Sequence, residues 1–232
     1  MKSSERLVQI IVAIMLLVGL MPLGNTLNNI KEDAGLADRF IQRPVLGFDS
    51  IASDVLWVKT IQYMAGVKKI DVKSANIIYE MFERITDLDP LFTTAYTFGA
   101  LAVSNKSPAK ALTLFDKAIA HNPDIGWRIP MFAGVVSMHN MKNYDKSAEY
   151  FALASKVKDS PMLLKRMRAL AKSRAGDLGT ALILWESLYN STDSTSVQIA
   201  KRELVRVAAE ILKTSTDNKL RNKADRVIKR IL

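Results

Sequence analysis

Hydrophobic positions recur along most of this chain with the spacing of an α-helix. Three large apolar residues, Trp57, Ile61 and Met64, stand at positions i, i+4 and i+7, which places them on one helix face. Residues 78–85 repeat this spacing, and Pro90 then ends the helix because proline cannot continue it. Glycine and proline number only 10 and 7, few for an all-β protein full of turns. The pattern predicts an all-α fold.

The helical pattern also repeats at a longer period. The aromatic residues Phe82, Phe115, Phe151 and Trp185 are separated by 33, 36 and 34 residues. Mostly small or aliphatic residues stand at fixed offsets from them: Ile85, Ala118, Ala154 and Leu188 three positions later, and Ile78, Ala111, Ser147 and Ala181 four positions earlier. Such a period is typical of stacked helix–turn–helix units, in which small residues let paired helices approach closely.

Period and residue types together resemble the tetratricopeptide repeat over about residues 53–191. The second helix of each unit matches best: Ala111, Phe115, Ala118 and Pro123 stand where the family has alanine, an aromatic residue, alanine and proline. The resemblance implies helix pairs that stack side by side into a short superhelix, because a single pair cannot bury its apolar face alone.

The repeats occupy the middle of the chain. Residues 49–191 are expected to form about four helix pairs. Two further amphipathic helices, over residues 197–213 and 217–232, are expected to cap the exposed end of the array within the C-terminal segment 192–232.

An uncharged, mostly apolar run over residues 7–23 precedes the repeats. Its 17 residues reach the lower limit for crossing the hydrocarbon core of a bilayer, and Lys2 and Arg6 stand before it. We expect residues 1–24 to form a cytoplasmic start and a transmembrane signal anchor, followed by a connector over residues 25–48. Two alternatives stay open: a secretory signal peptide that is cleaved, although the small-x-small cleavage pattern is missing, and a buried helix of a soluble body.

The basic residues around this run predict its orientation. Two of them precede it, whereas the first basic residue after it, Lys31, is followed at once by Glu32 and Asp33. By the positive-inside rule the N-terminus lies in the cytoplasm and the body lies outside. In a bacterium this would be a single-pass protein of the inner (cytoplasmic) membrane with its body in the periplasm.

The net charge of +10 is confined to the second half of the chain. Residues 1–124 carry equal numbers of acidic and basic groups, so the whole excess lies in residues 125–232. One interpretation is a solvated basic surface that keeps the protein soluble. Another is attraction to an anionic neighbour, either an acidic protein partner or lipid headgroups. The outward topology argues against nucleic acid as the partner.

The composition and the motifs argue against an enzyme. The chain has no cysteine and only two histidines, His121 and His139, which excludes disulfides, cysteine-ligated metals and a three-histidine metal site. No phosphate-binding glycine loop and no Gly-x-Ser-x-Gly motif occurs. We therefore predict no catalytic residue, no bound metal and no cofactor.

Binding is the function class that the resemblance favours, because first helices line the concave groove in the tetratricopeptide family. By the family's register the exposed groove positions here are Thr97, Leu101, Phe132, Val136, His139, Asn140, Arg166, Leu170 and Arg174. The family's lysine-and-asparagine clamp for a peptide carboxylate is not reproduced. The prediction is a membrane-anchored scaffold that holds a protein partner of a cell-envelope or membrane complex. An exported soluble binding protein and, third, an enzyme accessory subunit are the alternatives.

The register also makes a packing prediction. Ala118 and Ala154 are expected to lie between tightly packed helices, and Lys117 is expected to be exposed to solvent.

Overall fold

The computed structural model of the chain describes residues 49–122 and 124–231, and the regular structure in these residues is entirely helical. The helices are α3 (Asp49–Gly66), α4 (Val72–Leu88), α5 (Thr93–Val103), α6 (Pro108–His121), α7 (Arg128–His139), α8 (Tyr144–Lys156), α9 (Met162–Arg174), α10 (Leu178–Tyr189), α11 (Ser194–Thr214) and α12 (Asn218–Ile231). The all-α prediction is confirmed for this part of the chain. The expected anchor and connector, residues 1–24 and 25–48, lie outside the described residues.

None of the helices in the described ranges is both long enough and apolar enough to cross a membrane.

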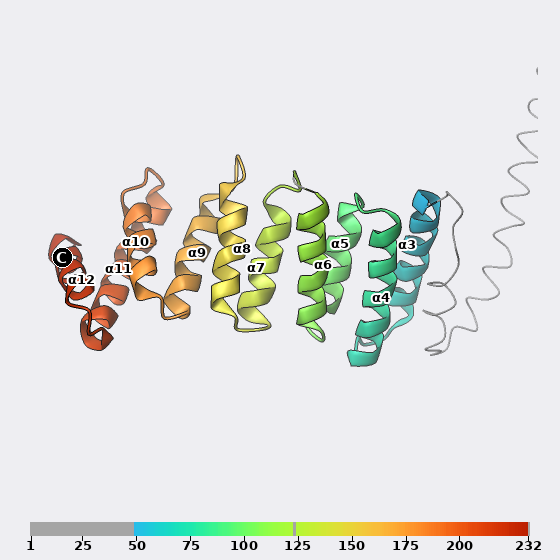
Figure 1. Cartoon of the computed structure of the whole chain (residues 1–232), viewed down its shortest axis with the longest axis horizontal. Coiled ribbons are helices and arrows are strands. Elements are labelled where there is room, and N and C mark those ends of the chain that lie inside the picture. The colour runs from blue at the N-terminus through green and yellow to red at the C-terminus, as the bar shows by residue number, and fades with distance from the viewer. Residues whose placement is uncertain (1–48, 123, 232) are drawn as a thin grey trace, which may run out of the picture. The chain divides into compact units, whose positions relative to one another are not determined.

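Each helix packs mainly against the helices next to it in sequence, both within a pair (α5 with α6) and between pairs (α6 with α7). In Figure 1 the helices follow one another in sequence order from α3 to α12, with α4 and α6 in front of α3 and α5. This arrangement is a helical repeat array. We call α3, α5, α7, α9 and α11 the first helices and α4, α6, α8, α10 and α12 the second helices.

The aromatic residues of the repeat form the core of the array. Phe82, Phe115 and Phe151 have no exposed surface, and Trp185 is 2% exposed. The residues at the two fixed offsets, including Ala118 and Ala154, are also buried. The register predicted from the sequence is therefore correct, and the small residues lie between packed helices as expected.

Two glycines show how closely the helices of the array approach. A Cβ atom on Gly99 of α5 would lie 2.5 Å from the ring of Phe82 on α4, and one on Gly134 of α7 would lie 2.8 Å from the ring of Phe151 on α8. A real side chain cannot take these positions unless the neighbour shifts. These glycines let an aromatic ring of a second helix press against the backbone of a first helix.

Aspartate and asparagine side chains start several of the second helices and α11. Asp71, Asn143, Asp177 and Asp193 each accept a hydrogen bond from the backbone N–H three residues later, at 2.8–3.1 Å. These caps satisfy N–H groups that have no partner inside the helix. The turn before Asp177 needs Gly176, whose φ of +80° lies in the left-handed region.

α7 begins at Arg128 and contains Pro130 in its first turn, where the missing N–H removes no helix hydrogen bond. Two local features differ from the sequence prediction. α11 begins at Ser194, three residues earlier than predicted, because Asp193 caps it. Lys117, expected to be exposed, has a side chain only 20% exposed, because its ammonium group reaches across to α4.

Candidate protein-binding surface

The first helices of the three central pairs present a surface that the fold leaves open. We call it the first-helix face and define it by the exposed or half-buried residues on one side of α5, α7 and α9: Thr97, Phe98, Leu101, Phe132, Val135, His139, Leu163, Arg166, Leu170 and Arg174. Phe98, Leu101 and Leu163 expose 51%, 41% and 47% of their surface. These three side chains are candidate contacts for another molecule, although single exposed apolar residues are also normal on a protein surface.

Most of the predicted groove residues do lie on this face. Leu101, His139, Arg174 and also Asn140, at the end of α7, are exposed, whereas Thr97, Phe132, Arg166 and Leu170 are half-buried. Asn140 donates a hydrogen bond to the side chain of Asn105 at 3.0 Å, which joins the ends of α7 and α5.

Val136 is the predicted groove residue that the structure does not place on the surface. It is 2% exposed, whereas its neighbour Val135 is half-buried. Phe132, one turn earlier on α7, stacks on Phe115 of α6 with ring centroids 6.5 Å apart. Val135 packs against the core cluster that α7 forms with α8 and α9.

Phe98 is the exposed aromatic residue of this face, and the sequence prediction missed it. Its ring contacts Trp57 of α3 edge-on, with centroids 5.6 Å apart, and Trp57 also contacts Phe82 and Phe92. Phe98 stands three residues before Leu101, so helical spacing alone could have added it to the predicted set.

Charges on the central helices are segregated by helix type. The first helices α5, α7 and α9 contain no carboxylate, and their basic residues are Arg128, Lys165, Arg166, Arg168, Lys172 and Arg174. The second helices α4, α6, α8 and α10 carry acidic residues on each helix: Glu80, Glu83, Asp87, Asp116, Asp145, Glu149 and Glu186. The basic cluster that the sequence places on one helix is therefore found on α9, without acidic neighbours on that helix.

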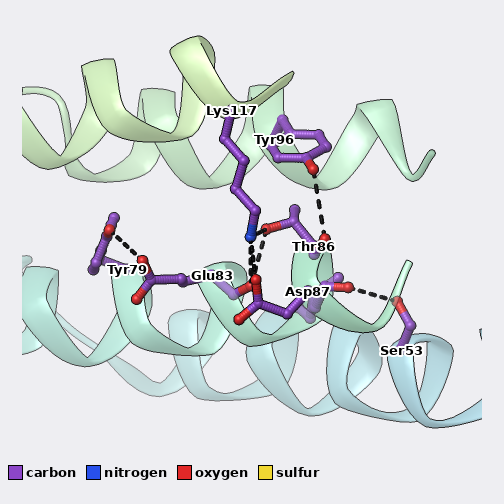
Figure 2. A network of polar contacts seen from close by, with 8 residues as sticks. Ser53, Tyr79, Glu83, Thr86, Asp87, Tyr96 and Lys117 are labelled. Atoms are coloured by element: carbon purple, nitrogen blue, oxygen red, sulfur yellow. Dashed lines mark hydrogen bonds and ion pairs between the residues drawn. The ribbon is translucent and has the colours of Figure 1, made fainter. Parts of the chain in front are cut away.

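The acidic residues of the second helices connect neighbouring pairs. Lys117 of α6 forms an ion pair with Asp87 of α4 and donates a hydrogen bond to Thr86 Oγ1 at 3.0 Å and to the Glu83 carbonyl at 3.4 Å. Figure 2 shows its ammonium group lying between Glu83, Thr86 and Asp87. The hydroxyl of Tyr96 on α5 donates to the carbonyl of the same Thr86 at 3.5 Å. The network therefore joins α4, α5 and α6.

Tyrosine hydroxyls extend this network along the second helices. Tyr79 donates to Glu83 Oε1 at 2.6 Å within α4 (Figure 2), and Tyr150 of α8 donates to Asp116 of α6. Burial, together with the adjacent carboxylate, raises the pKa of both tyrosines well above the usual range for a phenol. Both hydroxyls therefore stay protonated and act as donors.

Two of the repeat aromatic residues are followed directly by an acidic residue that forms ion pairs with the next second helix. Asp116, after Phe115, pairs with Lys146 of α8 at 3.4 Å. Glu186, after Trp185, pairs with Lys223 and Arg230 of α12, each at 3.1 Å. In both cases a carboxylate of one second helix meets a base of the next, which fixes neighbouring pairs relative to each other.

Arg166 on α9 differs from these residues because part of its guanidinium group has no hydrogen-bond partner. Its Nε and Nη1 atoms are buried and have no hydrogen-bond acceptor among the described residues. Its charge is felt by Asp193, whose pKa is lowered by hydrogen bonds from Ser196 and also by Arg166. Arg174, on the same face, is exposed, and its guanidinium lies 6.0 Å from the ring centre of Tyr144. Neither guanidinium group forms an ion pair with a carboxylate among the described residues, and that of Arg174 is exposed to solvent.

The arrangement supports recognition by contact. Among the described residues, no group of three or more histidine and acidic side chains is placed to hold a metal ion. The first-helix face has exposed apolar side chains on α5, both apolar and polar side chains on α7, and guanidinium donors on α9.

No known family model matches the chain, and no curated protein matches it.

Proposed function

We propose that this protein is a helical-repeat scaffold that binds a protein partner through its first-helix face. The observation that carries the proposal is the set of exposed apolar side chains, Phe98, Leu101 and Leu163, on helices that the array already holds in place. A rigid helix surface loses little conformational entropy on binding, so such side chains are suited to anchor a partner.

The division between the two helix types supports this proposal. The second helices use their charged groups on one another, as Asp116 does with Lys146 and Tyr150. On α9, Lys172 pairs with Asp145 and Asp177, whereas Arg166 and Arg174 form no ion pair among the described residues. The role we propose is therefore binding, with no catalytic step.

We further propose that the scaffold is held at the bacterial inner membrane by residues 7–23, with the array in the periplasm. The apolar run and the two basic residues before it support this. A reporter active only in the periplasm, fused after Leu232, should then be active, and a cytoplasm-specific reporter should be silent. The reverse result would contradict the proposed topology. The alternative, an exported soluble protein, would show as a shortened mature mass outside the membrane fraction.

Site-specific photocrosslinking tests the binding surface. A photoreactive amino acid is placed at Leu163 of α9 or, as a matched control, at Leu153 of α8. The two leucines are 47% and 46% exposed but lie on a first and a second helix. We expect a discrete adduct of one size from position 163 in living cells and none from position 153. Adducts from position 153 alone would place the interface on the second helices.

A further inference from the structure

The charge distribution of the central first helices identifies the chemistry of the partner. We propose that the first-helix face takes an acidic amphipathic protein segment, with carboxylates at Arg166 and Arg174 of α9 and an apolar side chain against Phe98 and Leu101 of α5. This inference rests on the proposed binding function and adds the class of partner and its direction along the array.

The absence of carboxylates on α5, α7 and α9 is the first support. Neighbouring charges on a folded surface are usually mixed in sign, and those of α4, α6 and α8 are. On α9 five bases stand within 13 residues, and Lys172 is the one with ion pairs among the described residues, to Asp145 at 2.9 Å and Asp177 at 3.2 Å. The other four bases of α9 form no ion pair among the described residues, although the carboxylate of Asp193 is near enough to Arg166 for the two charges to attract each other.

Arg166 gives the second support, because it is already partly desolvated. A guanidinium nitrogen that is buried without an acceptor has lost hydration and gained no hydrogen bond in return. A carboxylate from a partner would bring the opposite charge next to this guanidinium group, in a surrounding where the attraction is stronger than in free water.

The apolar end of the face gives the third support and sets the direction. α5 has no charged residue of either sign, and it exposes Phe98 and Leu101 on one side. A segment that is acidic throughout would gain nothing there, and a wholly apolar one would leave the guanidinium groups of α9 unpaired. A partner segment with acidic residues at one end and an apolar residue at the other matches both.

Fluorescence anisotropy with synthetic peptides tests this directly. Three labelled peptides of equal length are used with the full-length protein: one with glutamates in one half and leucines in the other, one with lysine in place of glutamate, and one with serine in place of leucine. We expect measurable binding of the glutamate–leucine peptide alone. Its dissociation constant should rise with salt between about 0.1 M and 1 M, because screening shortens the range of the attraction. Equal binding of the serine peptide or of the lysine peptide would overturn the proposal.

Variants then locate the contact. Arg166→Gln with Arg174→Gln should raise the dissociation constant of the glutamate–leucine peptide by about tenfold, and Leu101→Gln should raise it severalfold. The control, Arg202→Gln with Arg226→Gln, removes the same charge from exposed arginines of α11 and α12 and should leave binding unchanged. An equal effect of the control pair would show attraction by net charge alone and overturn the site.

Other anions are outcomes of the same test. Tighter binding to phosphatidylglycerol vesicles or to single-stranded oligothymidylate, lost in the Arg166 and Arg174 variant, would mean that the face recognises phosphate and would overturn the acidic-segment proposal. The photocrosslinking experiment distinguishes a failure of the acidic-segment inference from a failure of the proposed binding function. A specific adduct at Leu163 with no peptide binding would reject the acidic segment and leave the binding function standing. No adduct at all would reject both.

Discussion

The first and second helices of the central pairs differ in how they use their charged residues. On the second helices, acidic residues form ion pairs with bases of neighbouring helix pairs, as Asp87 does with Lys117 and Glu186 does with Arg230. On α5, α7 and α9 no acidic residue occurs, and Arg166 has buried nitrogens without an acceptor among the described residues. The charged residues of the second helices therefore link neighbouring pairs, whereas we propose that the first-helix face meets a partner.

The difference shows that exposure alone does not identify a binding surface. Leu153 and Ile183, on α8 and α10, are as exposed as Leu163 on α9. Single exposed apolar residues are normal on soluble proteins. What distinguishes the first-helix face is that exposed apolar residues occur together with Arg166 and Arg174, which form no ion pair among the described residues.

The largest effect should come from two adjacent leucines of α9. Leu164 is 1% exposed, and Leu164→Gln should cost about 2–5 kcal/mol of unfolding free energy, since it removes buried apolar surface and buries an amide. Leu163→Gln, the same change one residue earlier, should stay within about 0.5 kcal/mol because that side chain contributes to the outer face. Chemical denaturation of both variants measures this, and similar losses would contradict the assignment of Leu163 to the face.

A second pair of variants tests the packing between helices. Ala118→Leu should cost about 1–3 kcal/mol, because the buried position on α6 has no room for the larger side chain. Ala120→Leu, on the exposed side of the same helix, should change stability by less than about 0.5 kcal/mol. Thermal melts followed by circular dichroism compare the two. If both variants melt alike, the repeat register is wrong.

A third prediction concerns acid. Although partial burial works against it, hydrogen bonds from Thr180 and the ammonium of Lys172 hold the pKa of Asp177 below its usual value. A lowered folded-state pKa gives stability that is present above the unfolded pKa and is lost as pH falls through the folded one. Asp177→Asn keeps the helix cap and removes the charge, so it should cost less than about 1 kcal/mol at pH 7.

The pH dependence of that variant is the sharper observation. The difference in unfolding free energy between the wild-type protein and Asp177→Asn should shrink as the pH falls below the ordinary aspartate pKa. It should vanish once the pH also lies below the lowered folded-state pKa, because the carboxyl group is then protonated in both states. A difference that stayed constant through this acid range would show that the charge of Asp177 contributes nothing.

The smallest effect tests the ties between second helices. Lys117→Met keeps the aliphatic stem but removes the contacts with Asp87 and Thr86, and should cost about 0.5–1 kcal/mol. Lys201→Met, at an exposed position of α11, should cost close to nothing. Added salt should weaken the effect at Lys117 only in part, because that side chain is mostly buried. Equal losses of unfolding free energy in the two variants would mean that the contacts of Lys117 do not stabilise the array.

The helices and their register could be predicted because both follow from local spacing. Phe82, Phe115, Phe151 and Trp185 pack at equivalent places, so their sequence period is the spatial period of the array. The first-helix face was predicted in outline for the same reason, although Val136, predicted to be exposed, is buried.

The contacts that depend on a neighbouring pair could not be predicted. Lys117 has the polarity and helical position of a surface residue, and only the approach of α4 brings its ammonium group to Thr86. The unpartnered nitrogens of Arg166 are equally invisible in the sequence, because they depend on what the packed helices fail to supply. The sequence shows that α9 is basic, but it does not show which of these bases form ion pairs in the fold.

One binding measurement tests the central claim most directly. Once photocrosslinking has identified the partner, its dissociation constant is measured for two double variants that each remove two exposed apolar residues. Leu101→Gln with Leu163→Gln changes first helices, and Leu153→Gln with Ile183→Gln changes second helices. We predict an increase of about tenfold or more for the first pair and no change for the second, at equal stability. An unchanged dissociation constant in the first pair, or a larger loss in the second, would contradict the division between the two rows of helices.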